Sequence, residues 1–142
     1  MVSEIKSKIP AQGLEITRTE ALDKAWRLGF KGDFSLFNEI YHPDFKSINP
    51  IVGDVELNFD TFKEGVHTLK DFIIFTPSMI LPEEDKFLKV RRYNKLKEAD
   101  VFSLVTVSIT YKDGKIINQQ YLVEELEHDP SEGQDWNWED YE

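Results

Sequence analysis

The chain has 142 residues, a length that fits one domain with a single hydrophobic core. Its composition, 40% hydrophobic with no cysteine, indicates a folded protein and excludes disulfides and thiolate chemistry. Of the net charge of −10, much lies in residues 127–142, which hold seven acidic and no basic residues. Because binding to a phosphate backbone needs a basic surface, this balance argues against nucleic acid as a partner.

Three amphipathic helices are predicted in the first half of the chain. The first begins at a capping box formed by Thr17 and Glu20, and its apolar residues recur at helical spacing until Lys31 and Gly32. Asp33 is expected to cap a second helix that ends before a proline. Asp60 is expected to cap the third helix in the same way. Residues 1–16 show no clear period and are interpreted as a leader.

The second half of the chain is rich in β-forming residues. A short strand is expected over 45–48, and four longer runs cover 71–81, 86–96, 101–111 and 115–126. The turns between the four runs are short, and the last contains Asp113-Gly114, a strong hairpin signal. We therefore expect an α+β domain over residues 17–126, in which three helices pack on a curved antiparallel sheet. Residues 127–142 form an acidic tail with Trp136 and Trp138, which is disordered, adds an edge strand, or docks into a groove of its own domain or of a partner.

Three segments carry a resemblance to a known family. They are "GDFSLFNEIYHPDFKSINP" (32–50), "FKEGV" (62–66) and "YKDGKIINQQYLVEE" (111–125). In this order and at this spacing the chain resembles the nuclear transport factor 2-like superfamily, and within it the SnoaL-like polyketide cyclase group. The resemblance implies a cone-shaped, cystatin-like α+β barrel that encloses a cavity for a small molecule.

The ketosteroid isomerase branch of that superfamily can be compared directly. The resemblance places its catalytic aspartate at Asn49, and its oxyanion-donating tyrosine near Ala25, next to Trp26. An amide cannot take up a proton at neutral pH, so Asn49 cannot be a general base. The sequence therefore argues against steroid isomerase activity, and Asn49 and Trp26 are left as candidate ligand-binding residues.

In the SnoaL-like group, the resemblance implies a catalytic acid on the last strand, at Glu124. Strand alternation would place five residues on one face, which we expect to be the cavity wall: Ile116, Asn118, Gln120, Leu122 and Glu124. If the protein is an enzyme, Glu124 is the base for proton transfer next to a carbonyl, and Tyr41, Tyr93 or Gln120 donates to the oxyanion. The alternative is an exposed Glu124 at the rim.

Two neighbouring arginines lie in the middle of the run 86–96. On a period of two, either Arg91 or Arg92 faces the cavity, and we take Arg92 as the ligand-binding candidate. A buried arginine needs a carboxylate, which an anionic ligand or a structural ion pair with Glu124 or Asp44 would supply.

Two functions remain open from the sequence. The first is a SnoaL-like protein that binds a small, partly apolar molecule and, if it is an enzyme, catalyses an isomerase, cyclase or lyase-like reaction. The second is a dimerisation or protein-binding module with a self-filled pocket, which the apolar face of the run 101–111 would favour if that face is convex. A homodimer is expected in both cases.

His42 and His67 have no metal-ligand spacing, so no metal and no cofactor are expected. Without a secretory signal or an apolar run of membrane-spanning length, we expect a cytoplasmic protein with no membrane partner.

Overall fold

The structure of the chain is a computed structural model. It describes residues 8–11, 14–49, 55–79, 81, 84 and 86–142, with side chains from Thr17 onward except those of Ile48, Asn49 and Val55. Within these residues three helices and a six-stranded sheet form the body of the domain, and a separate pair of short strands precedes them. The expected α+β class, with helices on one side of a curved sheet, is confirmed.

The three helices are α2 (Arg18–Phe30), α3 (Ser35–Ile40) and α4 (Phe59–Leu69). Thr17 caps α2 as predicted, since its hydroxyl oxygen accepts a hydrogen bond from the Glu20 amide at 3.1 Å. The cap of α4 differs from the prediction, because the side chain of Asn58, and not Asp60, accepts from the Thr61 amide at 2.9 Å. Asp60 lies instead in the first turn, where a carboxylate is favoured by the helix dipole.

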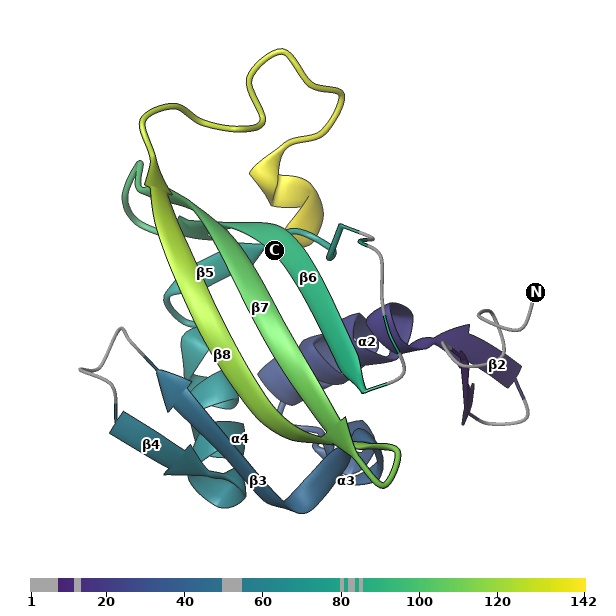
Figure 1. The fold of residues 1–142 in the computed structure, drawn as a ribbon. Coiled ribbons are helices and arrows are strands. Elements are labelled where there is room, and N and C mark those ends of the chain that lie inside the picture. Colours follow the sequence, from purple (N-terminus) through teal and green to yellow (C-terminus); the bar gives the residue numbers. More distant parts are fainter. Residues whose placement is uncertain (1–7, 12–13, 50–54, 80, 82–83, 85) are drawn as a thin grey trace.

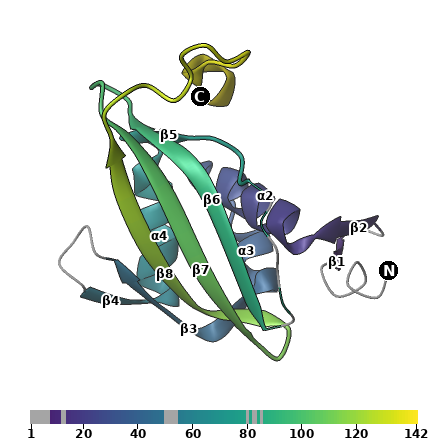
Figure 2. The same cartoon turned by 45° about the horizontal axis from the view of Figure 1, so that its top comes forward.

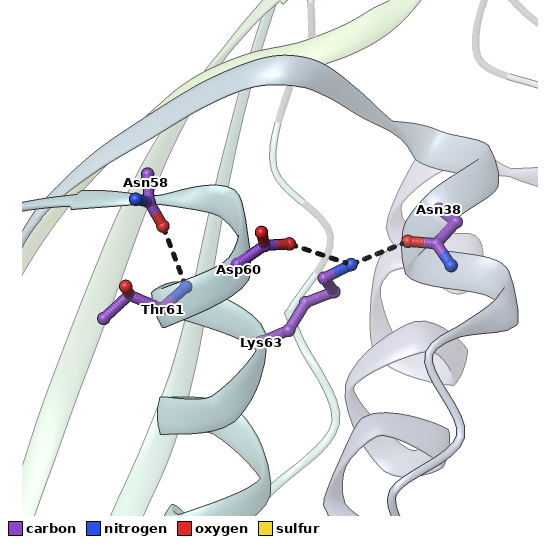
Figure 3. Close-up of polar contacts among 5 residues, drawn as sticks. All are labelled: Asn38, Asn58, Asp60, Thr61 and Lys63. Atoms are coloured by element: carbon purple, nitrogen blue, oxygen red, sulfur yellow. Dashed lines mark hydrogen bonds and ion pairs between the residues drawn. The ribbon is translucent and has the colours of Figure 1, made fainter.

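A lysine connects the first turn of α4 to the neighbouring helix (Figure 3). The Lys63 ammonium donates a hydrogen bond to the side-chain oxygen of Asn38 in α3 at 3.0 Å, and lies 3.7 Å from the Asp60 carboxylate. It also lies 4.2 Å from the centroid of the Phe59 ring. These contacts fix the start of α4 against α3 at the edge of the core.

The six-stranded sheet has the spatial order β4-β3-β8-β7-β6-β5. Its strands are β3 (Tyr41–Asn49), β4 (Val55–Asn58), β5 (Ile73–Phe75), β6 (Phe87–Leu96), β7 (Phe102–Lys112) and β8 (Lys115–Leu126). The last three form the antiparallel meander predicted from their short turns, and Asp113 and Gly114 have the positive φ angles of its final turn. The pairing of β3 with β8 is parallel and was not predicted.

The long strands β6, β7 and β8 curl around one side of the three helices (Figures 1 and 2). Helices α2 and α4 lie against this concave face, and the core between the two layers is rich in aromatic rings. Trp26 of α2 makes edge-on contacts with four of them, at centroid distances of 5.8 to 6.3 Å: Phe30, Phe37, Phe62 and Phe75.

A β-bulge in β8 decides which of its side chains face the helices. Tyr111 pairs with Ile116, but the preceding residue Thr110 pairs with Asn118, so Ile117 is an extra residue in β8. Because side chains alternate along a strand, one extra residue moves every later side chain to the opposite face. Ile116 is buried inward as predicted, whereas Asn118 is directed outward with Thr110.

The apolar face of β7 points toward the helices. Val105, Val107, Ile109 and Tyr111 all belong to the main core. The sequence argument for a dimer required this face to be convex, so that argument fails. The outer face of the meander carries Ser108, Thr106 and Arg91 beside the exposed Leu122. The homodimer itself stays a prediction.

The acidic tail folds back onto the outer side of the sheet near β5 (Figure 1). It ends in a short 3-10 helix, η2 (Trp138–Tyr141), and Trp138 is buried at 7% exposure against Phe102 of β7. The Trp138 indole N–H donates to the Asp129 carboxylate at 2.9 Å. Among the interpretations of the tail, the structure shows the one in which it docks on its own domain.

The chain before α2 forms a separate two-stranded sheet. Strands β1 (Lys8–Ala11) and β2 (Leu14–Thr17) pair antiparallel and lie beside the start of α2, apart from the large sheet (Figure 1). No helix in the described part of the chain is long and apolar enough to cross a bilayer.

Candidate functional site

A cavity of about 490 Å³ lies between α4, Trp26 of α2 and the concave face of the sheet. That volume is within the range of small-molecule binding sites. The wall is largely apolar, and the residues that supply its apolar surface include Trp26, Leu57, Phe62, Val66, Leu69, Ile73, Val105 and Val123. Its polar side chains come mainly from the strands: Ser47, Arg92, Asn94, Ser103 and Tyr121.

Arg92 is the one arginine that borders the cavity among the described residues. Its side chain is 2% exposed, and its guanidinium carbon lies 4.5 Å from the Trp26 ring centroid and 4.8 Å from that of Phe75. Burial lowers the pKa of Arg92 because the charged form loses its hydration, while nearby Tyr121 and Asp23 act in the opposite direction. The aromatic contacts stabilise the cation only in part, since a desolvated guanidinium also needs hydrogen-bond acceptors.

Three side chains form a buried hydrogen-bonded chain behind the cavity. The Tyr41 hydroxyl donates to Oε1 of Gln119, whose Nε2 in turn donates to the Tyr121 hydroxyl at 2.8 Å. Gln119 is fully buried, so this chain is what satisfies its amide. The Tyr121 hydroxyl accepts the hydrogen bond from Gln119 and also interacts with the Ser47 side chain. Burial raises the pKa of Tyr121 to about 12, although Arg92 opposes the shift, so it is a donor at neutral pH.

Several buried polar atoms in the cavity wall have no hydrogen-bond partner within the described residues. They are Nε and Nη1 of Arg92 and the side-chain oxygen of Asn94. Such atoms destabilise a folded protein by about 1–3 kcal/mol each, so they are rare unless an ordered water or a ligand satisfies them. Their concentration around one cavity makes this region the candidate binding site.

Gly65 lies in the middle of α4 and contributes to the cavity wall. A β-carbon at this position would meet no atom within 4 Å, so packing does not require a glycine there. The contrast is Gly29 of α2, where a β-carbon would collide with the Phe37 ring. Glycine in a helix interior is destabilising by about 1 kcal/mol relative to alanine. Gly65 lowers the stability of α4 and leaves space at the cavity.

The outer end of the cavity is lined by exposed apolar side chains. Leu96 is 42% exposed, Val101 is 37% exposed and Val123 is 38% exposed. They come from the ends of β6 and β8 and from the residue before β7, so the mouth opens at that end of the meander. In the other direction, exposure falls to a few per cent at Trp26 and Arg92, which marks the closed end.

The structure distributes the predicted site residues over both faces of the sheet. Trp26 and Arg92 lie in the cavity wall, and Tyr41 lies directly behind it through Gln119. Tyr93 is on the outer face, where its ring stacks on Trp136 of the tail. The side chain of Asn49, at the end of β3, lies outside the described residues. The ligand-binding role of these residues stays a prediction.

The prediction for the last strand was wrong about its face. Asn118, Gln120 and Glu124 do not line the cavity, and both Gln120 and Glu124 are exposed. Asn118 is half-buried and donates to the Lys46 backbone oxygen at 3.4 Å. The cause is the bulge at Ile117, which directs Gln119, Tyr121 and Val123 inward instead. Glu124 therefore has no access to a ligand in the cavity, and the structure gives its role as a base no support.

Neither His42 nor His67 lies in the cavity wall. The half-buried His67 in α4 has its Nδ1 3.1 Å from the Phe30 carbonyl oxygen, so it joins the end of α2 to α4. His42 accepts a hydrogen bond from the Asp44 amide at 3.0 Å. The part of the chain that the structure describes contains no cluster of three acidic or histidine residues able to hold a metal ion.

Solved structures with the same arrangement of helices and sheet have low sequence identity to this chain. A nuclear transport factor 2-like protein of unknown function from Burkholderia xenovorans has a TM-score of 0.60 at 15% identity, over 78% of this chain and 85% of that one. The chain has the nuclear transport factor 2-like fold. The fold that the sequence resemblance implied is therefore confirmed.

Other proteins with the nuclear transport factor 2-like fold differ in what they are described to do. IdmH from Streptomyces antibioticus, described as "a putative polyketide cyclase", has a TM-score of 0.59 at 12% identity, over 74% of this chain and 90% of that one. An LEH-like epoxide hydrolase from M. tuberculosis has a TM-score of 0.57 at 14% identity, over 75% of this chain and 81% of that one. No protein-family model and no curated protein matches the sequence. These likenesses establish the fold, not the activity.

Proposed function

We propose that this protein binds a small, partly apolar molecule in the cavity between α4 and the concave sheet. The observation that carries the proposal is the open cavity of about 490 Å³ with unpartnered polar atoms in its apolar wall. The rival function, a module with a self-filled pocket, requires side chains that close this space. Gly65 argues against a self-filled pocket, because a larger residue at this position would fill space that glycine leaves empty.

Proton transfer next to a carbonyl is less well supported than simple binding. Among the described residues that line the cavity there is no Asp, Glu or His. Tyr121 is protonated at neutral pH because burial raises its pKa to about 12, so it can donate a hydrogen bond but cannot act as a base. The arrangement therefore favours a binding protein over an isomerase or cyclase. The homodimer and the cytoplasmic location stay predictions.

A neutral fluorescent probe tests the proposal without assuming the ligand's charge. N-phenyl-1-naphthylamine becomes more fluorescent in apolar surroundings, so we expect its emission to rise when it is titrated with the wild-type protein. The variant Gly65→Phe places an aromatic ring in the open space beside α4, and we expect it to abolish the rise. Equal emission with both proteins would show that the probe does not enter the cavity and would contradict the proposal.

A second variant controls for the addition of aromatic surface. Leu122 is 58% exposed on the outer face of β8, so Leu122→Phe adds the same ring away from the cavity. We expect Leu122→Phe to bind the probe as the wild-type protein does. Loss of binding in this control as well would indicate that the probe binds the outer surface.

A further inference from the structure

The charge of Arg92 is unbalanced inside the protein. No ion pair joins Arg92 to an acid in the described part of the chain, and its Nε and Nη1 have no hydrogen-bond partner there. Asp23 is the acid whose charge acts on Arg92, but it forms no ion pair with Arg92, and Ser78 donates to both oxygens of its carboxylate, at 2.8 Å and 2.6 Å. The two acids predicted as partners, Glu124 and Asp44, are exposed. The structural ion pair expected from the sequence is therefore not formed.

A buried guanidinium without an anion is an unfavourable arrangement, and a ligand can supply the anion. Arginine binds carboxylates in a planar, bidentate geometry, and these charge-assisted hydrogen bonds are stronger than neutral ones. We propose that the ligand of this cavity is an amphipathic monocarboxylate, whose carboxylate binds Arg92 at the closed end and whose apolar body extends to the mouth. This inference rests on the proposed function and specifies the chemical class of its ligand.

The charges around Arg92 favour a ligand with a single negative charge. The other cation in the wall, Lys95, donates its ammonium to the backbone oxygens of Leu96 and Lys97 at 2.9 and 3.5 Å. Arg92 is therefore left as the single buried cation of the described wall. The net charge of −10 of the whole chain also repels multiply charged anions. A carboxylate fits these conditions better than a phosphate, which carries more charge and needs more donors.

The apolar body of the ligand follows from the path between Arg92 and the mouth. Along the concave face of β6, Arg92 is followed by Asn94 and then by Leu96 at the mouth. Val105 and Val123 flank this path from β7 and β8. An unbranched chain or a ring system along it would cover apolar surface that is now open, while Asn94 offers an unpartnered oxygen on the way.

The proposal is tested by comparing octanoate with octanamide, two probes of nearly the same shape that differ in charge. We expect isothermal titration calorimetry to show octanoate binding to the wild-type protein at least tenfold more tightly than octanamide. The variant Arg92→Met keeps an apolar side chain of similar length, and we expect it to lose this preference. Arg91→Met is the matched control, because Arg91 is exposed on the outer face, and it should keep the preference.

The outcomes separate this proposal from the one on which it rests. Equal affinity of the wild-type protein for the two probes, or an unchanged preference in Arg92→Met, would overturn the assignment of a carboxylate to Arg92. If N-phenyl-1-naphthylamine still enters the cavity in that case, the proposed binding function stands. If none of the three compounds binds, both proposals are wrong. The comparison in the wild-type protein needs no variant, so it remains decisive if Arg92→Met does not fold.

Discussion

The guanidinium carbon of Arg92 lies 4.5 Å from the ring centroid of Trp26, and the Arg92 side chain is 2% exposed. The contact joins β6 to α2 at the closed end of the cavity. A cation–π contact of this kind contributes about 2 kcal/mol when desolvated, less than the several kcal/mol that desolvation of an ion costs. The Arg92–Trp26 contact therefore offsets only part of the cost of burying the guanidinium.

Replacing Arg92 with methionine should stabilise the protein in the absence of ligand. The change removes an unpaired buried charge and retains apolar contact with Trp26 and Phe75, so we expect the free energy of unfolding to rise by about 1 kcal/mol or more. Urea denaturation followed by circular dichroism measures the free energy of unfolding. The control variant Arg91→Met should change this free energy by no more than about 0.5 kcal/mol. A clear loss of stability in Arg92→Met would show that Arg92 holds the fold together.

Alanine substitutions at two glycines should have opposite effects on stability. Gly65→Ala adds a methyl group where nothing lies within 4 Å, so we expect α4 to gain about 1 kcal/mol from better helix propensity. Gly29→Ala places the same group against the Phe37 ring and should destabilise the protein. Thermal unfolding of both variants checks the pair. If Gly65→Ala were destabilising as well, the space beside α4 would not be open.

Removing the hydroxyl of Tyr41 should be costly because it leaves a buried acceptor unsatisfied. In Tyr41→Phe the fully buried Gln119 loses the donor to its Oε1, and we expect a loss of about 1–3 kcal/mol of unfolding free energy. The double variant Tyr41→Phe/Gln119→Leu should lose less than the sum of the two single changes, since neither partner is then left alone. Strict additivity in chemical denaturation would argue that the two side chains do not interact.

Docking of the tail should weaken in acid. Burial alone would raise the pKa of Asp129, but hydrogen bonds from Ser131 and Trp138 outweigh it and hold the pKa below its ordinary value. A carboxyl with a lowered folded-state pKa stabilises the folded state above its unfolded pKa of about 3.9. That contribution is lost as the pH falls through the folded-state value. We therefore expect tryptophan fluorescence to report release of the tail below about pH 4.

A variant without the titrating group supplies the control for this pH dependence. Asp129→Asn keeps a side-chain oxygen that can accept from the Trp138 indole, but its charge does not change with pH. We expect its fluorescence to show no corresponding step. The same step in both proteins would assign the transition to other acids.

Much of the local structure could be predicted from the sequence. The cap at Thr17, the helical spacing of apolar residues and the turn at Asp113-Gly114 are determined by neighbouring residues, and each lies where it was expected. The α+β class follows from the order of these elements. The burial of Trp138 could not be predicted from the sequence, because a tail with two indoles is compatible with both disorder and docking.

The candidate site depended on two features that no local pattern encodes. One is the parallel pairing of β3 with β8, which joins strands far apart in the chain and brings Ser47 to the same wall as Tyr121. The other is the bulge at Ile117. Because of it, Tyr121 and Val123 line the cavity, whereas Gln120 and Glu124 face outward.

The sequence by itself determined which segments are helices and strands, because propensity, capping and turn geometry act over a few residues. The sequence also predicted that either Arg91 or Arg92 faces the cavity. Only the tertiary structure decided that Arg92 faces inward and forms no ion pair with an acid among the described residues. The physical reason is that a strand has two faces separated by one residue, and the core, not the strand, determines which face is buried.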